Sequence, residues 1–323
     1  MMSKCICNIR TRPVIAGATM ALIGMLGLSG CERAQSTKPA AAPTVCTTFY
    51  PTTYFAQRIA SDLVNVTNPC PADADPAFWM PSDEDIAVYQ QAKLIIINGA
   101  SFEKWLDKVT LPEQRLVDTT KPLEAEFIML KDAVRHKHGP AGEHTHEGVD
   151  GHTWLDPVNA TLQATEIKRA FDKAFPEHVA EFQQNYDKLV ADLEALDQRF
   201  QKVSEKMRGE VILCNHPAYN YIGRRYQWDL KTFHLHPDEM PGEEALAEIK
   251  AFVDELKDKP AKRILWEGEP LATIAEKMND ELGIASVVFS PCEALDAEQL
   301  ASGKDFLSVM KANADRLEKA FGQ

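Results

Sequence analysis

Short apolar runs alternate with amphipathic segments over two stretches of the chain, and this alternation restricts the possible folds more than any other feature. The run Leu94-Ile95-Ile96-Ile97 is wholly apolar, as expected of a strand in a parallel sheet that helices cover on both faces. Strands that alternate with helices are typical of the α/β class. We therefore expect an α/β fold of two lobes, 45–156 and 209–323, each with a mainly parallel sheet flanked by helices.

Each lobe has four expected strands. Those of the first lobe are 45–49, 63–67, 94–97 and 115–118. Those of the second lobe are 211–214, 230–233, 263–266 and 285–289, with helices at 217–226, 242–258, 270–282 and 303–320.

A helical segment is predicted between the lobes. Asp156 followed by Pro157 favours a helix start, because the aspartate caps the first turn and proline fits within it. From Phe182 to Met207, eight apolar residues recur at steps of four and three, which predicts one long helix with a single buried stripe. A coiled-coil dimer would show the same pattern, but only one such segment occurs. We therefore interpret residues 157–208 as a helical segment that joins the lobes.

The N-terminus has the pattern of an export signal. Three basic residues precede the apolar run 13–30, and the sequence Leu28-Ser29-Gly30-Cys31 follows. These four residues resemble the lipobox of bacterial lipoproteins, in which the cysteine is lipid-modified. We expect residues 1–31 to be a lipoprotein signal ending in the lipidated Cys31, with a plain secretory signal as the alternative. Residues 32–44 would be a flexible tether at the periplasmic or extracellular face of the cell membrane.

Charge and cysteine content limit the partners of the chain. Its 35 basic and 48 acidic residues give a net charge of −13, and loss of the signal's three basic residues would make it −16. Nucleic-acid binding needs a basic face, so we expect no nucleic-acid partner. An exported protein can form disulfides. Cys214 and Cys292 both follow strands of the second lobe, where a disulfide, a metal thiolate and two free thiols are all consistent with the sequence.

Histidines are concentrated in one segment that also carries five glycine or proline residues. Of the nine histidines, five lie within 17 residues: His136, His138, His144, His146 and His152. In an extended backbone, residues two apart face the same way, so a His-x-His pair can reach one cation. We expect a mobile metal-binding loop at 135–152, the alternative being a solvated polar loop. A third pair, His234 and His236, suits either ligands or a polar turn.

Two histidines lie at the ends of predicted elements. His216 directly follows the strand 211–214, and His152 precedes the helix cap at Asp156 by four residues. Ligands of open α/β sheets gather at the carboxyl ends of the strands. We therefore expect His152 and His216, one from each lobe, to bind a ligand together.

The sequence around these histidines resembles the zinc and manganese solute-binding lipoproteins of bacterial ABC importers over nearly the whole exported chain. The matching motifs are Thr48-Phe49-Tyr50-Pro51, Asp75-Pro76 with Pro81-Ser82 and Asp85-Ile86, Asn98-Gly99 with Glu103 and Trp105, 150–157, and Asn215-His216-Pro217-Ala218-Tyr219. The resemblance implies a metal site between two lobes, with His152 and His216 as the second and third ligands.

The chain departs from that family at two ligand positions. Ala77 stands where the family has its first histidine, and Ser290 where it has a late aspartate. We expect the His-rich loop to supply the missing donors, with His136 and His138 ahead of His144 and His146. Glu267 resembles a glutamate of the family, which implies that it binds the metal or accepts a hydrogen bond from a metal ligand. The alternative is a surface carboxylate.

We therefore expect an extracytoplasmic solute-binding protein, monomeric and not an enzyme, that captures a divalent transition metal and passes it to the permease of an ABC importer. Imidazoles favour zinc, whereas manganese prefers oxygen donors; copper and nickel also bind nitrogen well. One alternative is a zinc-dependent hydrolase, because an incomplete ligand set leaves a catalytic position open, although no His-Glu-x-x-His motif occurs. The other is a metal buffer or surface adhesion protein that binds metal through the loop alone.

Overall fold

The computed structural model describes residues 44–137, 143–256, 259 and 261–322, without the side chains of 131–147. The expected signal, Cys31 and all but the last residue of the tether therefore lie outside the described residues, as does His138. Within the described part, no helix combines the length and hydrophobicity needed to span a bilayer.

The first sheet is four-stranded and parallel, with the strand order β2-β1-β3-β4. Its strands are β1 (Thr44–Thr47), β2 (Asn65–Thr67), β3 (Leu94–Ile97) and β4 (Leu116–Asp118). The chain between them forms helices α1 (Tyr50–Ala60) and α2 (Asp83–Gln91), and the short 3-10 helices η1 (Ser61–Leu63), η2 (Lys104–Lys108) and η3 (Glu113–Arg115). A fourth short 3-10 helix, η4 (Lys121–Glu126), follows β4. The parallel pairing brings the carboxyl ends of these strands to one edge of the sheet.

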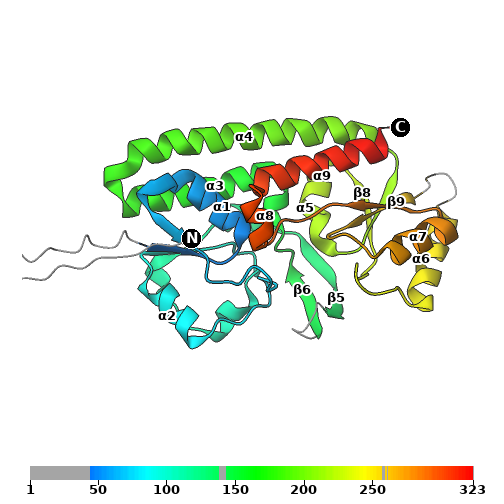
Figure 1. Ribbon diagram of the computed structural model, residues 1–323, viewed down its shortest axis with the longest axis horizontal. Helices are drawn as coiled ribbons and strands as arrows, with labels where there is room; N and C mark the ends of the chain where they lie inside the picture. Colours follow the sequence, from blue (N-terminus) through cyan, green and yellow to red (C-terminus); the bar gives the residue numbers. More distant parts are fainter. Residues whose placement is uncertain (1–43, 138–142, 257–258, 260, 323) are drawn as a thin grey trace, which may run out of the picture. The chain divides into compact units, whose positions relative to one another are not determined.

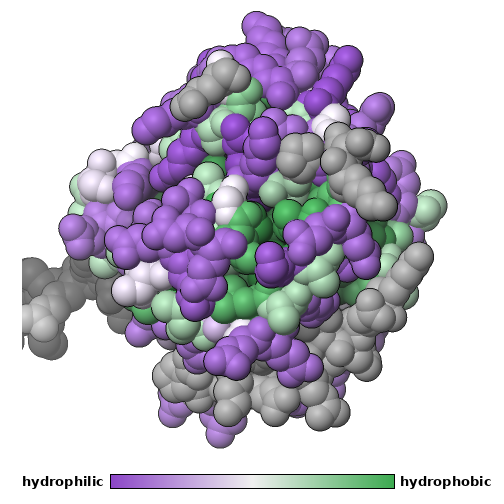
Figure 2. Space-filling view, turned by 90° about the vertical axis from the view of Figure 1, so that its right-hand side faces the viewer, coloured by the Kyte–Doolittle hydropathy of each residue, from purple (hydrophilic) through white to green (hydrophobic). Residues whose placement is uncertain are grey.

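The second sheet is also parallel, with the order β10-β9-β7-β8. Its strands are β7 (Val211–Cys214), β8 (Asp229–Thr232), β9 (Ala261–Trp266) and β10 (Ala285–Val288). Its helices are η8 (Pro217–Tyr219), α5 (Asn220–Tyr226), α6 (Glu243–Glu255), α7 (Ala272–Leu282), α8 (Ala297–Ala301) and α9 (Phe306–Phe321). At the end of this lobe, hydrophilic residues surround an apolar area (Figure 2). Two parallel β-sheets flanked by helices are thus present, as the alternation of strands and helices in the sequence predicts.

A long helix, α4 (Val179–Lys206), packs against both halves of the chain. It follows α3 (Pro157–Ala174), which Asp156 caps through Val158 N–H, and the 3-10 turn η7 (Pro176–His178). Its 28 residues make a rod of roughly 42 Å. The rod contacts α1 and α3 toward one end and α9 toward the other (Figure 1). A single apolar cluster joins this helix to both sheets. The predicted joining helix is therefore present, and it belongs to a core that both lobes share.

The segment expected to be an irregular loop has a regular backbone. Strands β5 (Met129–Lys137) and β6 (Glu143–Val149) form an antiparallel hairpin, and the 3-10 turn η6 (Thr153–Leu155) follows it. The expectation of a loop at 135–152 is therefore wrong for most of its length. Pairing in a two-stranded hairpin comes from backbone hydrogen bonds, and this polar sequence lacks the apolar alternation that would predict strands.

The cysteines of the described residues are free thiols. They are Cys46, Cys70, Cys214 and Cys292. Burial raises the pKa of the Cys214 and Cys292 thiols, so both are held in the neutral form. Of the alternatives for this pair, the disulfide is excluded.

Candidate metal centre

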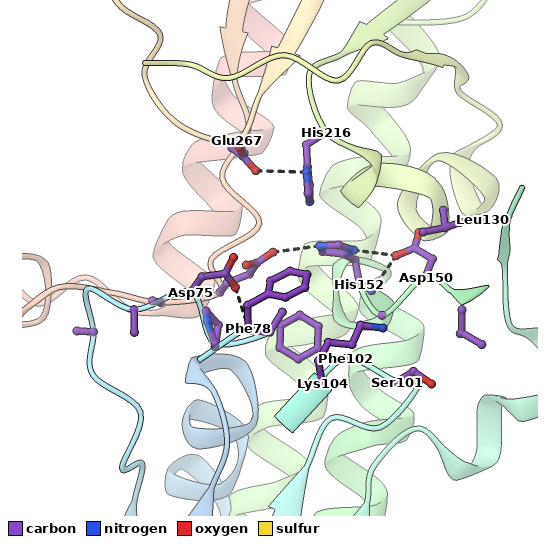
Figure 3. Close-up of a pocket in the computed structure, with 18 of the residues that line it drawn as sticks. Asp75, Phe78, Ser101, Phe102, Lys104, Leu130, Asp150, His152, His216 and Glu267 are labelled. Atoms are coloured by element: carbon purple, nitrogen blue, oxygen red, sulfur yellow. Dashed lines mark hydrogen bonds and ion pairs between the residues drawn. The ribbon is translucent and has the colours of Figure 1, made fainter. Parts of the chain in front are cut away.

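A cavity of about 280 Å³ lies where loops from the two sheets meet, and ionisable side chains line it (Figure 3). From the first lobe these are Asp73, Asp75, Lys104, Asp150 and His152; from the second they are His216, Glu267 and Glu293. Such a concentration of imidazoles and carboxylates in one cavity is typical of a metal site.

His152 is buried at the centre of this cavity and bonded to carboxylates on both sides. Its Nδ1 lies 2.7 Å from Asp150 Oδ1, and its Nε2 lies 3.1 Å from Glu293 Oε1. Asn220 Nδ2 donates to the other oxygen of Asp150 at 2.9 Å. Burial lowers the pKa of His152, but the hydrogen bonds to Asp150 and Glu293 outweigh it and raise the pKa to about 10. At neutral pH the ring is therefore a cation between two carboxylates.

His216 approaches from the second lobe, directly after β7 as predicted. Its Nδ1 lies 3.8 Å from Glu267 Oε2. Asn215 fixes Glu267, because Asn215 Nδ2 donates to Glu267 Oε1 at 3.3 Å and Asn215 Oδ1 accepts from Glu267 N–H at 3.0 Å. Burial, and then the charge of Glu293, raises the pKa of Glu267 to about 7. At 3.8 Å the contact between Glu267 and His216 is a charge contact rather than a hydrogen bond, and a carboxylate on the Nδ1 side of the ring favours the other nitrogen as the metal ligand.

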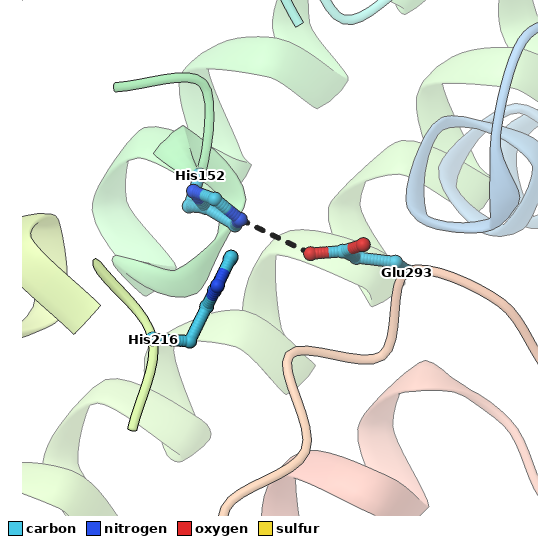
Figure 4. A group of neighbouring side chains, drawn as sticks. All are labelled: His152, His216 and Glu293. Carbon is cyan, nitrogen blue, oxygen red and sulfur yellow. Dashed lines mark hydrogen bonds and ion pairs between the residues drawn. The ribbon is translucent and has the colours of Figure 1, made fainter. Parts of the chain in front are cut away.

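Glu293 completes a group of three donors. One ligand atom each from His152, His216 and Glu293 lies within 4.8 Å of the other two (Figure 4), and the imidazole centroids are 5.3 Å apart. Donors around a tetrahedral zinc, with bonds of about 2.0–2.1 Å, are separated by roughly 3.3 Å. Small side-chain shifts would therefore bring all three onto one ion.

The loop that carries Glu293 follows the second sheet but is anchored to the first lobe. The Glu293 carbonyl accepts from Tyr50 N–H at 3.2 Å, and the Pro291 carbonyl accepts from Trp154 Nε1 at 2.8 Å. Glu293 is thus held between the lobes rather than by one of them.

Glu293 was not among the predicted ligands, because Ser290 stands where the family has its late aspartate and that ligand position was interpreted as vacant. Ser290 is occupied elsewhere: its N–H donates to Asn313 Oδ1 at 3.1 Å, and its hydroxyl oxygen accepts from Cys292 N–H at 3.2 Å. One feature of the sequence could have indicated Glu293: it is a carboxylate a few residues after the last strand, and ligands of α/β sheets bind at the carboxyl ends of the strands.

The remaining predicted ligands are the histidines of the hairpin. The hairpin register puts His136 opposite His144, but the side chains of His136, His144 and His146 lie outside the described residues, so their role stays a prediction. Among the described residues the hairpin lines the cavity only at its base, through Leu130 and Val149.

His234 and His236 are not among the described residues that line the cavity. His236 Nδ1 accepts from Asp238 N–H at 3.2 Å. Of the two alternatives for this pair, the structure favours the polar turn.

A two-lobed α/β protein with two histidines and a carboxylate meeting between the lobes fits the class of metal-binding solute receptors. The family model for ZnuA, "Zinc-uptake complex component A periplasmic", matches residues 45–320. The chain belongs to this family. The family consists of solute-binding receptors for zinc uptake and not of enzymes, as the sequence analysis predicted.

Relatives and solved structures agree with this assignment. The chain is 27% identical over 288 residues to zinc-binding lipoprotein AdcA of Streptococcus pneumoniae, covering 86% of this chain and 56% of the relative. It is 26% identical over 284 residues to high-affinity zinc uptake system protein ZnuA of Bacillus subtilis, covering 85% and 86%. The chain thus spans about half the length of AdcA.

Among solved structures, the metal-dependent lipoprotein YcdH of Bacillus subtilis matches with a TM-score of 0.73 at 25% identity, over 86% of this chain and 98% of that one. The Zn(II)-bound ZnuA-like domain of S. pneumoniae AdcA matches with a TM-score of 0.74 at 24% identity, over 87% and 100%. The predicted fold class is confirmed.

Proposed function

We propose that this chain is the extracytoplasmic receptor of an ABC importer, which captures Zn²⁺ between its lobes and delivers it to the membrane permease. The observation that carries the proposal is the convergence of His152, His216 and Glu293 within 4.8 Å. Two imidazole nitrogens and one carboxylate oxygen are donors that suit zinc. Membership of the zinc-uptake family favours zinc over manganese, copper and nickel as the cargo.

Capture requires the donors to exchange partners. His152 gives up the proton on Nε2, and Glu293 exchanges its hydrogen bond to that nitrogen for the ion. Asp150 remains on Nδ1 of His152 and Glu267 on Nδ1 of His216, which keeps the opposite nitrogens directed at the metal. Because α4 and the Glu293 loop contact both lobes, local adjustment of these side chains accounts for capture better than a wide hinge motion.

The domain organisation that we propose is the one expected from the sequence. Residues 1–31 would direct export and Cys31 would carry the lipid. Residues 32–44 would tether a monomeric receptor to the outer face of the cell membrane, and its lobes 45–156 and 209–323 would be joined by 157–208. Metabolic labelling with a fatty acid tests the anchor: incorporation should disappear in Cys31→Ala.

Metal analysis and competitive titration of the purified protein test the central proposal. We expect one tightly bound zinc per chain, and His216→Ala should lose at least a hundredfold in affinity while the protein stays folded. An unchanged affinity in His216→Ala would refute the site, and catalytic turnover of esters or peptides by the zinc-loaded protein would favour the hydrolase instead.

A further inference from the structure

Three donors leave one position of a four-coordinate zinc to be filled. The side chain at position 77 cannot fill it, because Ala77 lines the cavity with only a methyl group. The donor must therefore come from another residue around the same cavity, or from water.

Asp75 is placed in the cavity wall by a tight turn. Its Oδ1 accepts from Ala77 N–H at 2.9 Å, and its backbone carbonyl accepts from Trp79 N–H at 2.8 Å. The first bond fixes the carboxylate and the second fixes the backbone of the turn, whose residues 72–78 all line the cavity. Figure 3 shows the Asp75 carboxylate in the wall of this cavity, beside the carboxylate that is hydrogen-bonded to His152.

The electrostatic surroundings of Asp75 favour a cation. Burial, and then the charge of Glu293, raises the pKa of Asp75 to about 6, whereas the proximity of His152 lowers it. Asp75 also contributes to the raised pKa of Glu267. Three carboxylates from separate segments thus repel one another around one cavity, and a divalent ion would relieve that repulsion.

Other residues around the cavity are less suited to be the fourth donor. Glu267 already contacts His216 and Asn215, and Asp73 is exposed. Lys104 presents an ammonium, which has no lone pair to offer. We propose that Asp75 supplies the fourth donor, an oxygen, to the metal held by His152, His216 and Glu293. This inference rests on the proposed function and makes the site one of two nitrogens and two carboxylates.

Paired variants test the assignment. Asp75→Asn keeps an acceptor for Ala77 N–H but weakens metal ligation, whereas Asp83→Asn removes the same charge from an exposed residue that does not line the cavity. We expect zinc affinity to fall at least tenfold in Asp75→Asn and less than twofold in Asp83→Asn. The visible spectrum of the Co²⁺-loaded protein should change only in Asp75→Asn. In the Asp75→Asn background, Ala77→His should restore affinity, because it places an imidazole in the same turn.

The possible outcomes separate this inference from the proposed function. If Asp75→Asn and Asp83→Asn bind zinc alike while His216→Ala loses at least a hundredfold in affinity, Asp75 is not a ligand but the receptor site stands. A lower affinity in Asp75→Asn with an unchanged Co²⁺ spectrum would also overturn the inference, as would a spectral change found only in Glu267→Gln. Wild-type affinity in His216→Ala would instead reject the site as a whole.

Discussion

His152 Nε2 lies 3.1 Å from Glu293 Oε1, which joins residues 141 positions apart in the sequence and closes the cavity between the lobes. This contact is an ion pair while His152 is protonated, and the metal must replace it. The same side chains therefore hold the lobes together before capture and hold the cargo afterwards. Exchange of a proton for a metal ion is the chemical event that capture requires.

Zinc binding should release protons at neutral pH. The pKa of His152 is raised to about 10, from about 6.5 in an unfolded chain, so its proton must leave when zinc binds. We expect about one proton released from His152 per zinc at pH 7.5, measured by calorimetry in buffers of different ionisation enthalpy. Affinity should keep rising as the pH increases from 6.5 toward 10. A flat affinity over this range, with no proton release, would exclude His152 as a ligand.

The stability of the metal-free protein should have the opposite pH dependence at this site. A folded-state pKa above the unfolded value means that the His152 ion pairs stabilise the fold fully below pH 6.5, and this contribution is lost as the pH rises through about 10. In Glu293→Gln the loss of stability between pH 7 and 10 should be smaller than in the wild type. Chemical denaturation at several pH values measures the difference, and identical slopes would contradict the assignment.

The Asp150 carboxylate, which is hydrogen-bonded to His152, should increase the affinity for zinc without binding the metal itself. Asp150→Asn removes the charge that holds Nδ1 at 2.7 Å, and changes of this kind typically cost 10–100-fold in metal affinity. The matched control is Asp238→Asn, which alters the exposed carboxylate 4.0 Å from Nδ1 of His236. Competitive titration should show a loss for Asp150→Asn alone. Equal affinities for the two variants would show that Asp150 has no role in zinc binding.

The hairpin histidines and the cavity can be tested separately. Replacing His136, His138, His144 and His146 by asparagine keeps the polar hairpin but removes its imidazoles. If zinc binds in the cavity, this variant should keep one tightly bound zinc and lose only zinc ions that bind more weakly. Zinc titration measures both the stoichiometry and the affinity. Complete loss of binding would favour the buffer or adhesion alternative, in which the hairpin alone holds metal.

The sequence predicted those parts of the fold that have a periodic apolar pattern. The strands at 94–97 and 211–214 were predicted with the observed bounds, and the joining helix was recognised from its buried stripe. Helix α2 was missed because Tyr89 is its only buried residue, so it shows no periodicity. The hairpin was missed for the same reason, since its polar strands pair through their backbones.

Only those residues of the site that lie at the end of a predicted helix or strand could be predicted from the sequence. His152 and His216 precede a helix and follow a strand, respectively, and both positions point to the cavity. Glu293 instead lies in an irregular loop, next to Cys292 with a left-handed φ of 60°. A cysteine gives no hint of that conformation, so the direction of Glu293 depends on contacts with Tyr50 and Trp154 that the sequence does not reveal.

The core along α4 should unite both lobes in one cooperative unit. Leu193 is fully buried in the shared apolar cluster, and Leu193→Ala should lower the free energy of unfolding by about 2–5 kcal/mol. The exposed Glu194→Ala should change it by less than about 0.5 kcal/mol. Denaturation followed by circular dichroism should give one transition for the wild type and Leu193→Ala. Two separate transitions would show that the lobes unfold independently.

A crystal structure of the zinc-loaded protein, with the metal located by its anomalous scattering at the zinc edge, measures the central relationship directly. A single strong peak should lie about 2.0–2.1 Å from a ring nitrogen of His152 and of His216, with a Glu293 oxygen at a similar distance. A peak bound only by hairpin histidines, or imidazoles of His152 and His216 that cannot reach one ion, would contradict capture between the lobes.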